Sequence, residues 1–433
     1  MRYAIEEVEL EGGEARVVVP QGAAGVAVLL RRNGAPVSFI LRKAPVGVQL
    51  GLVELRGAEI EAGRVSVDAP EKDLEEAGVS LPRVSLAICT KGQRLRQLRE
   101  CLESICQHAP QLFQAPNEVL LVENCPIKPS LACLESTYPG LHHVWEPVPG
   151  LSVARNRAMR EARGEIIAYL DDDVVLDRGW LVGLVRAFRA SDQAAGFSGP
   201  IFPRRLDTPA QIWLAYRGGF SHDCSPHRWV RCAPGLPWTW PCGEACFGAG
   251  ANMAFRREAL IEMGGFDESL GAGTPSLGGE DLEIFYRVLA HGWMWVYEPR
   301  MAVFHEDRAE LADLRHQIRG WGRGYASYLL KYLSSPNPDW PRFFWVFCKT
   351  LFRKFAGVPG TVLGLRKYPW PVVLAWEELR GFVEAVAWAY WAARLRRRFN
   401  GRTRVGLLRA MGERATLERL NRRSEASRAV QRR

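Results

Sequence analysis

The sequence predicts an α/β protein centred on a mainly parallel sheet flanked by helices. From residue 83 onward, short apolar runs alternate with amphipathic helical patterns, an order typical of parallel strands joined by right-handed crossovers. Before that point, apolar and polar positions alternate between turn residues, and from residue 311 the chain is helical, basic and aromatic. We therefore expect a small β-rich domain at 1–80, the α/β domain at 83–310 and a helical region at 311–433.

The N-terminal part predicts strands and one tight turn. Apolar runs occupy 17–19, 26–30 and 37–41. The sequence Arg32-Asn33-Gly34-Ala35 separates the last two runs and predicts a hairpin, because Asn-Gly accepts the positive φ angles of such a turn. The polar stretch 68–82 indicates a short helix and a linker.

In the central domain, expected strands and helices follow one another along the chain. The expected strands are 84–90, 118–123, 166–170, 197–202, 251–255 and 295–305, and the expected helices are 95–107, 152–163, 180–190 and one that begins at Glu280 or Asp281. Within 95–107, Leu95, Leu98 and Leu102 share one face, as expected for a helix packed on a sheet.

The composition limits the classes of protein to which this chain can belong. The chain has 433 residues, of which 47% are hydrophobic and 24% charged, as in ordinary globular proteins of two or three domains. No run reaches the roughly 18 uninterrupted apolar residues of a membrane span, and the N-terminus lacks the pattern of a signal peptide. We therefore expect a cytoplasmic protein.

The net charge of +9 is concentrated at the C-terminal end. Residues 394–433 contain fourteen Arg and three Glu, so the rest of the chain is slightly acidic. Such a tail is a solvated end, a contact to anionic membrane or, least favoured, a nucleic-acid arm. Because no nucleic-acid recognition motif accompanies it, we expect no nucleic-acid partner.

Two aromatic segments precede this basic tail. In 340–355, one side carries Phe344, Phe347, Cys348, Leu351 and Phe355, and the charges are Lys349, Arg353 and Lys354. In 382–391, Trp388, Tyr390 and Trp391 come just before Arg394. These segments either pack on the central domain or lie in a membrane interface. The second interpretation predicts a peripheral protein on the inner face of the cell membrane, bound to anionic lipid.

Four of the ten cysteines cluster in the sequence, at Cys224, Cys232, Cys242 and Cys246. Their spacing does not match the paired CxxC pattern of common zinc sites. Unlinked thiols or an opportunistic disulfide are therefore favoured over structural zinc.

Polar side chains follow three of the expected strands. The run Asp171-Asp172-Asp173 is the most unusual, because adjacent carboxylates repel one another and such a cluster usually needs a cation. Thr90 and Glu123 end the other two strands. Ligands bind at the carboxyl ends of parallel strands, and carboxylates there suit Mg²⁺ or Mn²⁺. The alternative is a solvated turn that caps the next helix.

The motifs resemble the family 2 glycosyltransferases of the GT-A fold, inverting enzymes that transfer a sugar from a nucleotide diphosphate. The matching segments, in family order, are VSLAICTKGQR, EVLLVEN, GLSVARNRAMREARGEIIAYLDDDVVL, GANMAFRREALIEMGGFDESL, GGEDLEIFYRVLAHG and VFHEDR. They cover roughly residues 83–308. The two flanks lie outside the resemblance.

The resemblance implies roles for residues at the strand ends. Thr90, Glu123 and Arg155 would line the pocket for the donor nucleotide, where Glu123 replaces the commoner Asp. Asp171 would face the ribose, and Asp172 could share that role or the metal's. For the metal itself, the implied ligands are Asp173 and His305.

The resemblance also implies a catalytic acid pair and an acceptor side. Asp281 would be the general base and Glu280 would orient the acceptor or the glycine-rich loop 271–279, although acids in a first helical turn can also act only as caps. Aromatic planes stack on sugar rings, so we expect Trp238 and Trp240 to face the acceptor, together with Asn252.

These expectations amount to a metal-dependent inverting glycosyltransferase that uses Mn²⁺ or Mg²⁺. The donor would be a nucleotide sugar, with a UDP-sugar favoured, and the acceptor a glycan or a lipid-linked molecule. One alternative is a nucleotidyltransferase, although Lys91-Gly92-Gln93-Arg94 is a poor phosphate loop. The other is a non-catalytic nucleotide- or glycan-binding protein, against which the acidic triplet, Asp281 and His305 argue.

Overall fold

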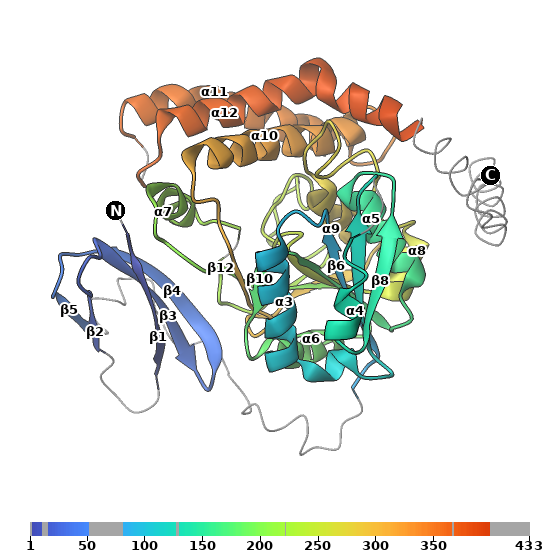
Figure 1. Ribbon diagram of the computed structural model, residues 1–433. Helices are drawn as coiled ribbons and strands as arrows, with labels where there is room; N and C mark the ends of the chain where they lie inside the picture. The colour runs from blue at the N-terminus through green and yellow to red at the C-terminus, as the bar shows by residue number, and fades with distance from the viewer. Residues whose placement is uncertain are drawn as a thin grey trace.

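The computed structural model describes residues 2–10, 16–51, 81–126, 130–220, 222–365 and 368–398. Its centre is an eight-stranded sheet in the order β13-β15-β11-β14-β9-β6-β7-β8. The strands are β6 (Val84–Thr90), β7 (Glu118–Asn124), β8 (Leu141–Glu146), β9 (Ile166–Asp171), β11 (Ala194–Ser198), β13 (His227–Trp229), β14 (Asn252–Arg256) and β15 (Met294–Tyr297). Only β13 and β14 pair antiparallel with their neighbours. The predicted α/β class is therefore confirmed (Figure 1).

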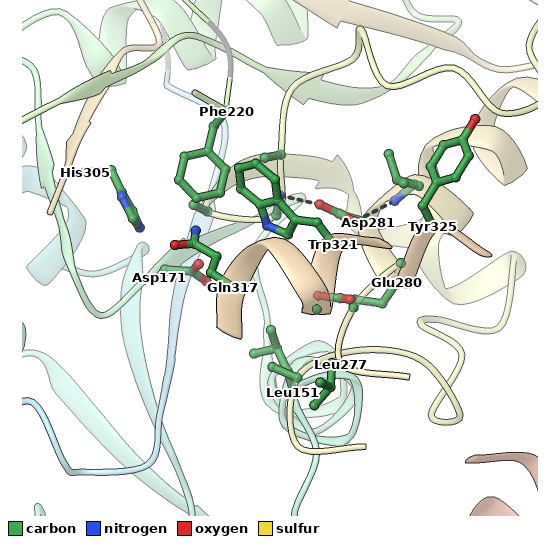
Figure 2. A pocket seen from close by; sticks show the side chains of 18 of the residues that line it. Leu151, Asp171, Phe220, Leu277, Glu280, Asp281, His305, Gln317, Trp321 and Tyr325 are labelled. Atoms are coloured by element: carbon green, nitrogen blue, oxygen red, sulfur yellow. Dashed lines mark hydrogen bonds between the residues drawn. The ribbon is translucent and has the colours of Figure 1, made fainter. Parts of the chain in front are cut away.

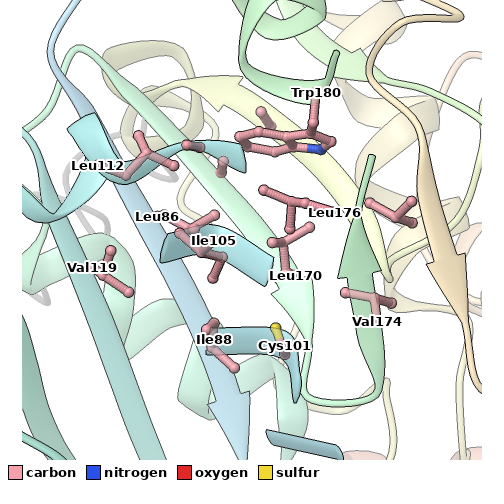
Figure 3. Close-up of a cluster of buried hydrophobic side chains, with 14 of the residues drawn as sticks. Leu86, Ile88, Cys101, Ile105, Leu112, Val119, Leu170, Val174, Leu176 and Trp180 are labelled. Carbon is pink, nitrogen blue, oxygen red and sulfur yellow. The ribbon is translucent and has the colours of Figure 1, made fainter. Parts of the chain in front are cut away.

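Helices cover both faces of this sheet. They are α3 (Leu95–His108), α4 (Leu134–Thr137), α5 (Leu151–Glu161), α6 (Trp180–Arg189), α8 (Arg257–Glu262) and α9 (Glu280–Ala290). Helix α7 (Pro209–Tyr216) instead packs between the N-terminal sheet and the C-terminal helices. Successive side chains of a strand point to opposite faces. Leu86 and Ile88 accordingly join the cluster under α3 and α6 (Figure 3), whereas Ala87 joins the cluster under α5 and α9. The strands are thus buried on both sides, as parallel strands require.

Two of the expected strands are each divided in two. The range 295–305 forms β15 and β16 (Val303–His305), and 197–202 forms β11 and β12 (Ile201–Pro203). Pro299 and Pro200 lie at the breaks, and proline cannot donate to a strand ladder. The second halves join β10 (Val174–Leu176) in a separate sheet of order β10-β16-β12.

The N-terminal part forms a three-stranded sheet of β1 (Ala4–Glu9), β3 (Gly25–Arg32) and β4 (Ala35–Lys43), with a ribbon of β2 (Arg16–Val18) and β5 (Gln49–Gly51). The predicted hairpin is confirmed, because Asn33 and Gly34 have φ of 49° and 73° between paired β3 and β4. A buried ion pair between Arg31 and Asp177 ties this sheet to the central domain. The helix expected within 68–82 falls largely outside the described residues.

The C-terminal region forms a layer of α10 (Leu311–Leu333), α11 (Trp340–Val362) and α12 (Val372–Glu384), and a π-helical turn at 385–389 continues α12. In Figure 1, α11 and α12 lie outside α10, which is nearer the central domain. Phe347 and Leu351 pack inward, whereas Phe344 and Phe355 are exposed. Within the described ranges, no helix is long and apolar enough to cross a membrane.

Glycines allow α10 to pack backbone to backbone both on the central domain and on α12. A Cβ at Gly324 would lie 2.5 Å from the carbonyl carbon of Gly278, and a Cβ at Gly322 would lie 2.1 Å from the carbonyl oxygen of Glu378 in α12. Both distances are shorter than a side chain tolerates. The glycine-rich loop 271–279, which leads into α9, is therefore supported directly by the C-terminal layer.

Candidate active site

A cavity of about 1140 Å³ lies between the carboxyl ends of the central strands and the C-terminal helical layer. The predicted residues that line it are Thr90, Arg155, Asp171, Asp172, Asp173, Glu280, Asp281 and His305. They come from β6, α5, β9 and its following turn, α9 and β16. Most of the catalytic and donor-side residues predicted from the sequence therefore share one cavity.

The three consecutive carboxylates each have different partners. Asp171 is partly exposed and lies 3.4 Å from Nη2 of Arg155. The hydroxyl of Thr90 donates to Asp172, and burial raises the pKa of Asp172. Asp173 is almost fully buried among cations. The run is therefore not a solvated turn.

Three cationic or potentially cationic side chains contact Asp173. Arg94, at the start of α3, donates to its Oδ2, Arg308 lies 3.5 Å from the same oxygen, and His305 Nε2 lies 3.3 Å from Oδ1. Burial alone would raise the pKa of Asp173, but these neighbours, His305 first, hold it well below its usual range. An ionised carboxylate thus stays at this strand edge.

Strand pairing brings His305 to Asp173. β10 and β16 are antiparallel with Val174 opposite His305, and the amide of Glu306 donates to the Asp173 carbonyl at 3.0 Å. Asp307 Oδ1 lies 2.8 Å from His305 Nδ1. Burial would lower the pKa of His305, but Asp173 and Asp307 together raise it to about 10.

The residues present fit a divalent cation at this edge. Because Nδ1 of His305 is engaged by Asp307, Nε2 is the nitrogen that faces Asp173, and such an outer carboxylate is typical of metal-binding histidines. A carboxylate and an imidazole suit Mn²⁺. No group of three or more candidate ligands converges within the described ranges, so the protein would supply two ligands.

Arg155 connects the acidic strand end to the start of α9. Its side chain is buried, and it donates to Glu280 Oε1 at 3.0 Å and to the Gly250 carbonyl at 2.9 Å, in addition to its pairing with Asp171. Two carboxylates therefore share one guanidinium. This explains how a charged residue of α5 can be buried in the domain.

The two acids at the start of α9 differ in environment. Asp281 Oδ2 accepts from the amide of Gly250 at 3.1 Å (Figure 2), which holds the carboxylate in the cavity. Glu280 is buried, and its Oε2 has no hydrogen-bond partner in the described part of the chain. Burial and the neighbouring Asp281 raise the pKa of Glu280 to about 7, against the opposing effect of Arg155.

Glu280 should therefore make stability depend on pH. Its pKa rises from 4.5 to about 7 on folding, so the native state binds this proton more tightly. The resulting stabilisation is complete below about pH 4.5 and is lost as pH rises to about 7. We expect the difference in unfolding free energy between wild type and Glu280→Gln to change across this window, as measured by urea unfolding. A difference that is constant with pH would contradict this assignment.

Four of the residues predicted from the sequence do not line the cavity. Glu123 is buried and accepts from the amides of Ser130 and Leu131 and from His143, whose Nε2 lies 2.9 Å away. Its neighbour Asn124 lines the cavity instead. The role of Glu123 beside the nucleotide stays a prediction.

The expected acceptor-side residues lie elsewhere. Asn252 is fully buried, accepts from the Trp180 indole at 2.9 Å and donates to the Met301 carbonyl at 2.6 Å. Trp240 belongs to the core cluster below α9, and Trp238 is 54% exposed and outside the cavity lining. We therefore leave these three residues out of the proposed acceptor site.

Several cavity residues were not predicted. Phe220, Gln317 and Trp321 surround the same cavity as Asp171 and Asp281 (Figure 2). Gln317 and Trp321 belong to α10, outside the segment that carried the resemblance. The one signal available in the sequence was their spacing of four residues, which places both on one face of a helix.

Comparison with known proteins identifies the central domain. Residues 85–264 match the family described as Glycosyl transferase family 2. The chain carries a family 2 glycosyltransferase domain. The predicted resemblance is thereby confirmed, and so is the class of enzyme, a glycosyltransferase that uses a nucleotide sugar.

Two relatives illustrate the range of this family 2 similarity. The succinoglycan biosynthesis protein ExoM of Rhizobium meliloti is 29% identical over 244 residues, covering 53% of this chain and 70% of that protein. The pre-mycofactocin glycosyltransferase of Mycobacterium tuberculosis is 29% identical over 175 residues, covering 40% of this chain but only 33% of that protein. The similarity thus spans about a third of one relative and about two thirds of the other.

Among solved structures, the chain is similar to a mannosyltransferase from Pyrobaculum calidifontis in complex with GDP-Man and Mn²⁺. The sequence identity is 17% and the TM-score 0.46, over 72% of this chain and 88% of that one.

Proposed function

We propose that this protein transfers a sugar, with inversion, from a nucleotide diphosphate donor to a hydroxyl of a glycan or lipid-linked acceptor. The observation that carries the proposal is the Asp281 carboxylate, which the Gly250 amide holds in the same cavity as the acidic strand end. We also propose the division into parts at 1–80, 83–310 and 311–433.

In this mechanism Asp281 takes the proton of the acceptor hydroxyl. The acceptor oxygen then forms a bond to the anomeric carbon as the bond to the donor diphosphate breaks. A single displacement inverts the configuration. Arg155 positions the acids around this step, because it binds Asp171 and Glu280 at once.

Negative charge gathers on the leaving diphosphate. Asp173 and His305 would hold a divalent cation, Mn²⁺ or Mg²⁺, which supplies Lewis acidity at that point when bound. Arg94 and Arg308 lie at the same edge and would add positive charge. Thr90, Asp171 and Asp172 would contact the nucleotide, and we retain a UDP-sugar as the favoured donor.

A donor screen tests this function. The protein would be incubated with UDP-, GDP- and dTDP-sugars and Mn²⁺, and release of nucleoside diphosphate and of pyrophosphate would be measured separately. We expect a nucleoside diphosphate. Release of pyrophosphate would instead support nucleotidyl transfer, and binding without turnover would support a non-catalytic protein.

We further propose that the outer side of the C-terminal layer contacts an anionic membrane. Its large apolar residues are 48% to 74% exposed, and we call them the aromatic surface: Phe344, Trp345, Phe352, Phe355, Trp376, Trp388 and Trp391. These side chains lie on α11, on α12 and on the helical residues 385–391 that continue α12, and clusters of exposed apolar side chains mark interaction sites. Lys349, Arg353 and Arg394 add positive charge on the same elements, which complements anionic lipid.

Flotation with vesicles tests the membrane contact. We expect Phe352→Ser/Phe355→Ser to lower binding to anionic vesicles at least about tenfold, because burying each ring contributes roughly 1.5–3 kcal/mol. High salt should also release the wild type. Val18→Ser, which alters an apolar residue of β2 that is as exposed as Phe355, is the control. Binding that is indifferent to lipid charge and to the double substitution would refute the contact.

Point variants serve better here than truncation. Arg396 donates to the Gly273 carbonyl at 2.6 Å, and Arg397 donates to Asp267 at 2.9 Å. Removing the chain after Ala393 would therefore disturb the loop before Asp281 as well as the basic tail.

A further inference from the structure

The cavity continues past the catalytic edge into the C-terminal layer. Its lining there includes His316 and Trp321 of α10, Arg353 and Lys354 of α11, and Glu378 of α12. Arg217, just after α7, also lines it. Apart from Arg217, this end of the cavity is thus built from the C-terminal helices, which lie outside the family 2 match at 85–264.

Arg217 is held rigidly with part of its charge unsatisfied. Its guanidinium lies 5.4 Å from the ring centre of Trp321 and 4.9 Å from that of Trp370, and Nη2 donates to Glu378 at 2.5 Å. Its Nη1 is buried and has no hydrogen-bond partner in the described ranges. An arginine fixed in this way has lost its rotamer freedom before any ligand arrives, which favours anion binding.

Positive charge exceeds negative charge around this arginine. Lys354 Nζ donates at 2.8 Å to the same Glu378 oxygen, so one carboxylate meets two cations. Arg353 forms no ion pair with any described residue. Asp313 is the other acid in this part of the lining, which leaves three cations, and His316, against two carboxylates.

The cationic cluster of Arg217, Arg353 and Lys354 shares a cavity with the proposed base and a helix with the proposed membrane contact. Asp281 and Trp321 line the same cavity as Arg217 and Lys354. Arg353 and Lys354 belong to α11, the helix that also carries Phe352 and Phe355 of the aromatic surface. The helix that supplies part of the aromatic surface therefore also supplies two cations to the cavity that holds Asp281.

We propose that Arg217, Arg353 and Lys354 bind the phosphate of a lipid-linked acceptor. The sugar of that acceptor would extend toward Asp281 and its lipid toward the aromatic surface. This inference rests on the proposed function, which it narrows to one class of acceptor. A neutral glycan would leave the excess positive charge without a partner, whereas a phosphate accepts several charge-assisted hydrogen bonds at once.

Calorimetric titration of the full chain tests the site. The probes are dodecyl phosphate below its micelle concentration, inorganic phosphate and the neutral dodecyl maltoside. We expect dodecyl phosphate to bind more tightly than either of the other two. The variant Arg353→Gln/Lys354→Gln should weaken it about tenfold or more, since it removes two charged hydrogen-bond donors.

Lys43→Gln is the control. It removes a positive charge from an exposed residue of β4, outside both the cavity lining and the aromatic surface. Equal loss in Lys43→Gln, or no loss in the double variant, would overturn the site. Equal binding of inorganic phosphate would mean a free-phosphate site, and equal binding of dodecyl maltoside a purely apolar one, and either would overturn the lipid assignment.

UDP binding by the same proteins separates the two proposals. If UDP binds the wild type and both variants alike while dodecyl phosphate binding is unaffected by the double substitution, this inference alone fails. If the wild type does not bind UDP, the favoured donor class fails independently. UDP binding also reports that each variant is folded.

Discussion

Asp281→Asn is expected to lower sugar transfer by about a hundredfold or more while donor binding persists, because removal of a general base has effects of this size. The asparagine side chain is nearly isosteric with aspartate, and its oxygen can still accept from the backbone N–H of Gly250. The backbone at Gly250 should therefore keep its position. The measurement is the rate of nucleoside diphosphate release, with water as acceptor until the acceptor is known, beside calorimetric donor binding.

The control for this prediction is Asp313→Asn, which changes another acid of the cavity lining without touching α9. Reduced donor affinity with unchanged turnover in Asp281→Asn would identify the residue as a helix cap. Glu280 is a weaker candidate for the base. It is buried, and one of its oxygens is bound by Arg155.

The elements of the catalytic edge were predictable because they depend on local patterns. The apolar run before Asp171 alternates between the two faces of the sheet, and Thr90 follows a similar run. Parallel strands bring their carboxyl ends to one edge, so the convergence of these groups follows from the fold class alone.

Other contacts depend on long-range pairing that no local pattern encodes. The expected strand 295–305 breaks at Pro299, and only its second half pairs with β10 and brings His305 to Asp173. Arg94 was considered only as part of a poor phosphate loop, because its ion pair with Asp173 spans 79 residues of sequence.

The direction of the side chains explains why the expected acceptor-side residues do not line the cavity. Asn252 begins a strand, and its sequence position fits either a cavity-facing polar group or a buried hydrogen-bonding one. The structure places it against Trp180 and Met301. Trp321 was missed for a different reason, since an aromatic residue in a helical pattern most often indicates core packing.

The second large effect is expected for Asp173→Ala, which should reduce donor turnover by about a hundredfold or more and remove its stimulation by Mn²⁺. Asp173 is the shared partner of Arg94, His305 and Arg308, so its loss leaves these groups without their carboxylate at the edge where the diphosphate would bind. Direct titration with Mn²⁺ provides a readout that does not depend on turnover, and weaker Mn²⁺ binding is expected.

Asp192→Ala is the matched control, because that carboxylate is fully exposed on the surface of the same domain. Circular dichroism and thermal unfolding establish whether Asp173→Ala is folded. If folded Asp173→Ala bound Mn²⁺ and responded to it as the wild type does, Asp173 would not be a metal ligand. The cations around it would then serve the donor phosphates directly, with Arg94 and Arg308 as the residues to change next.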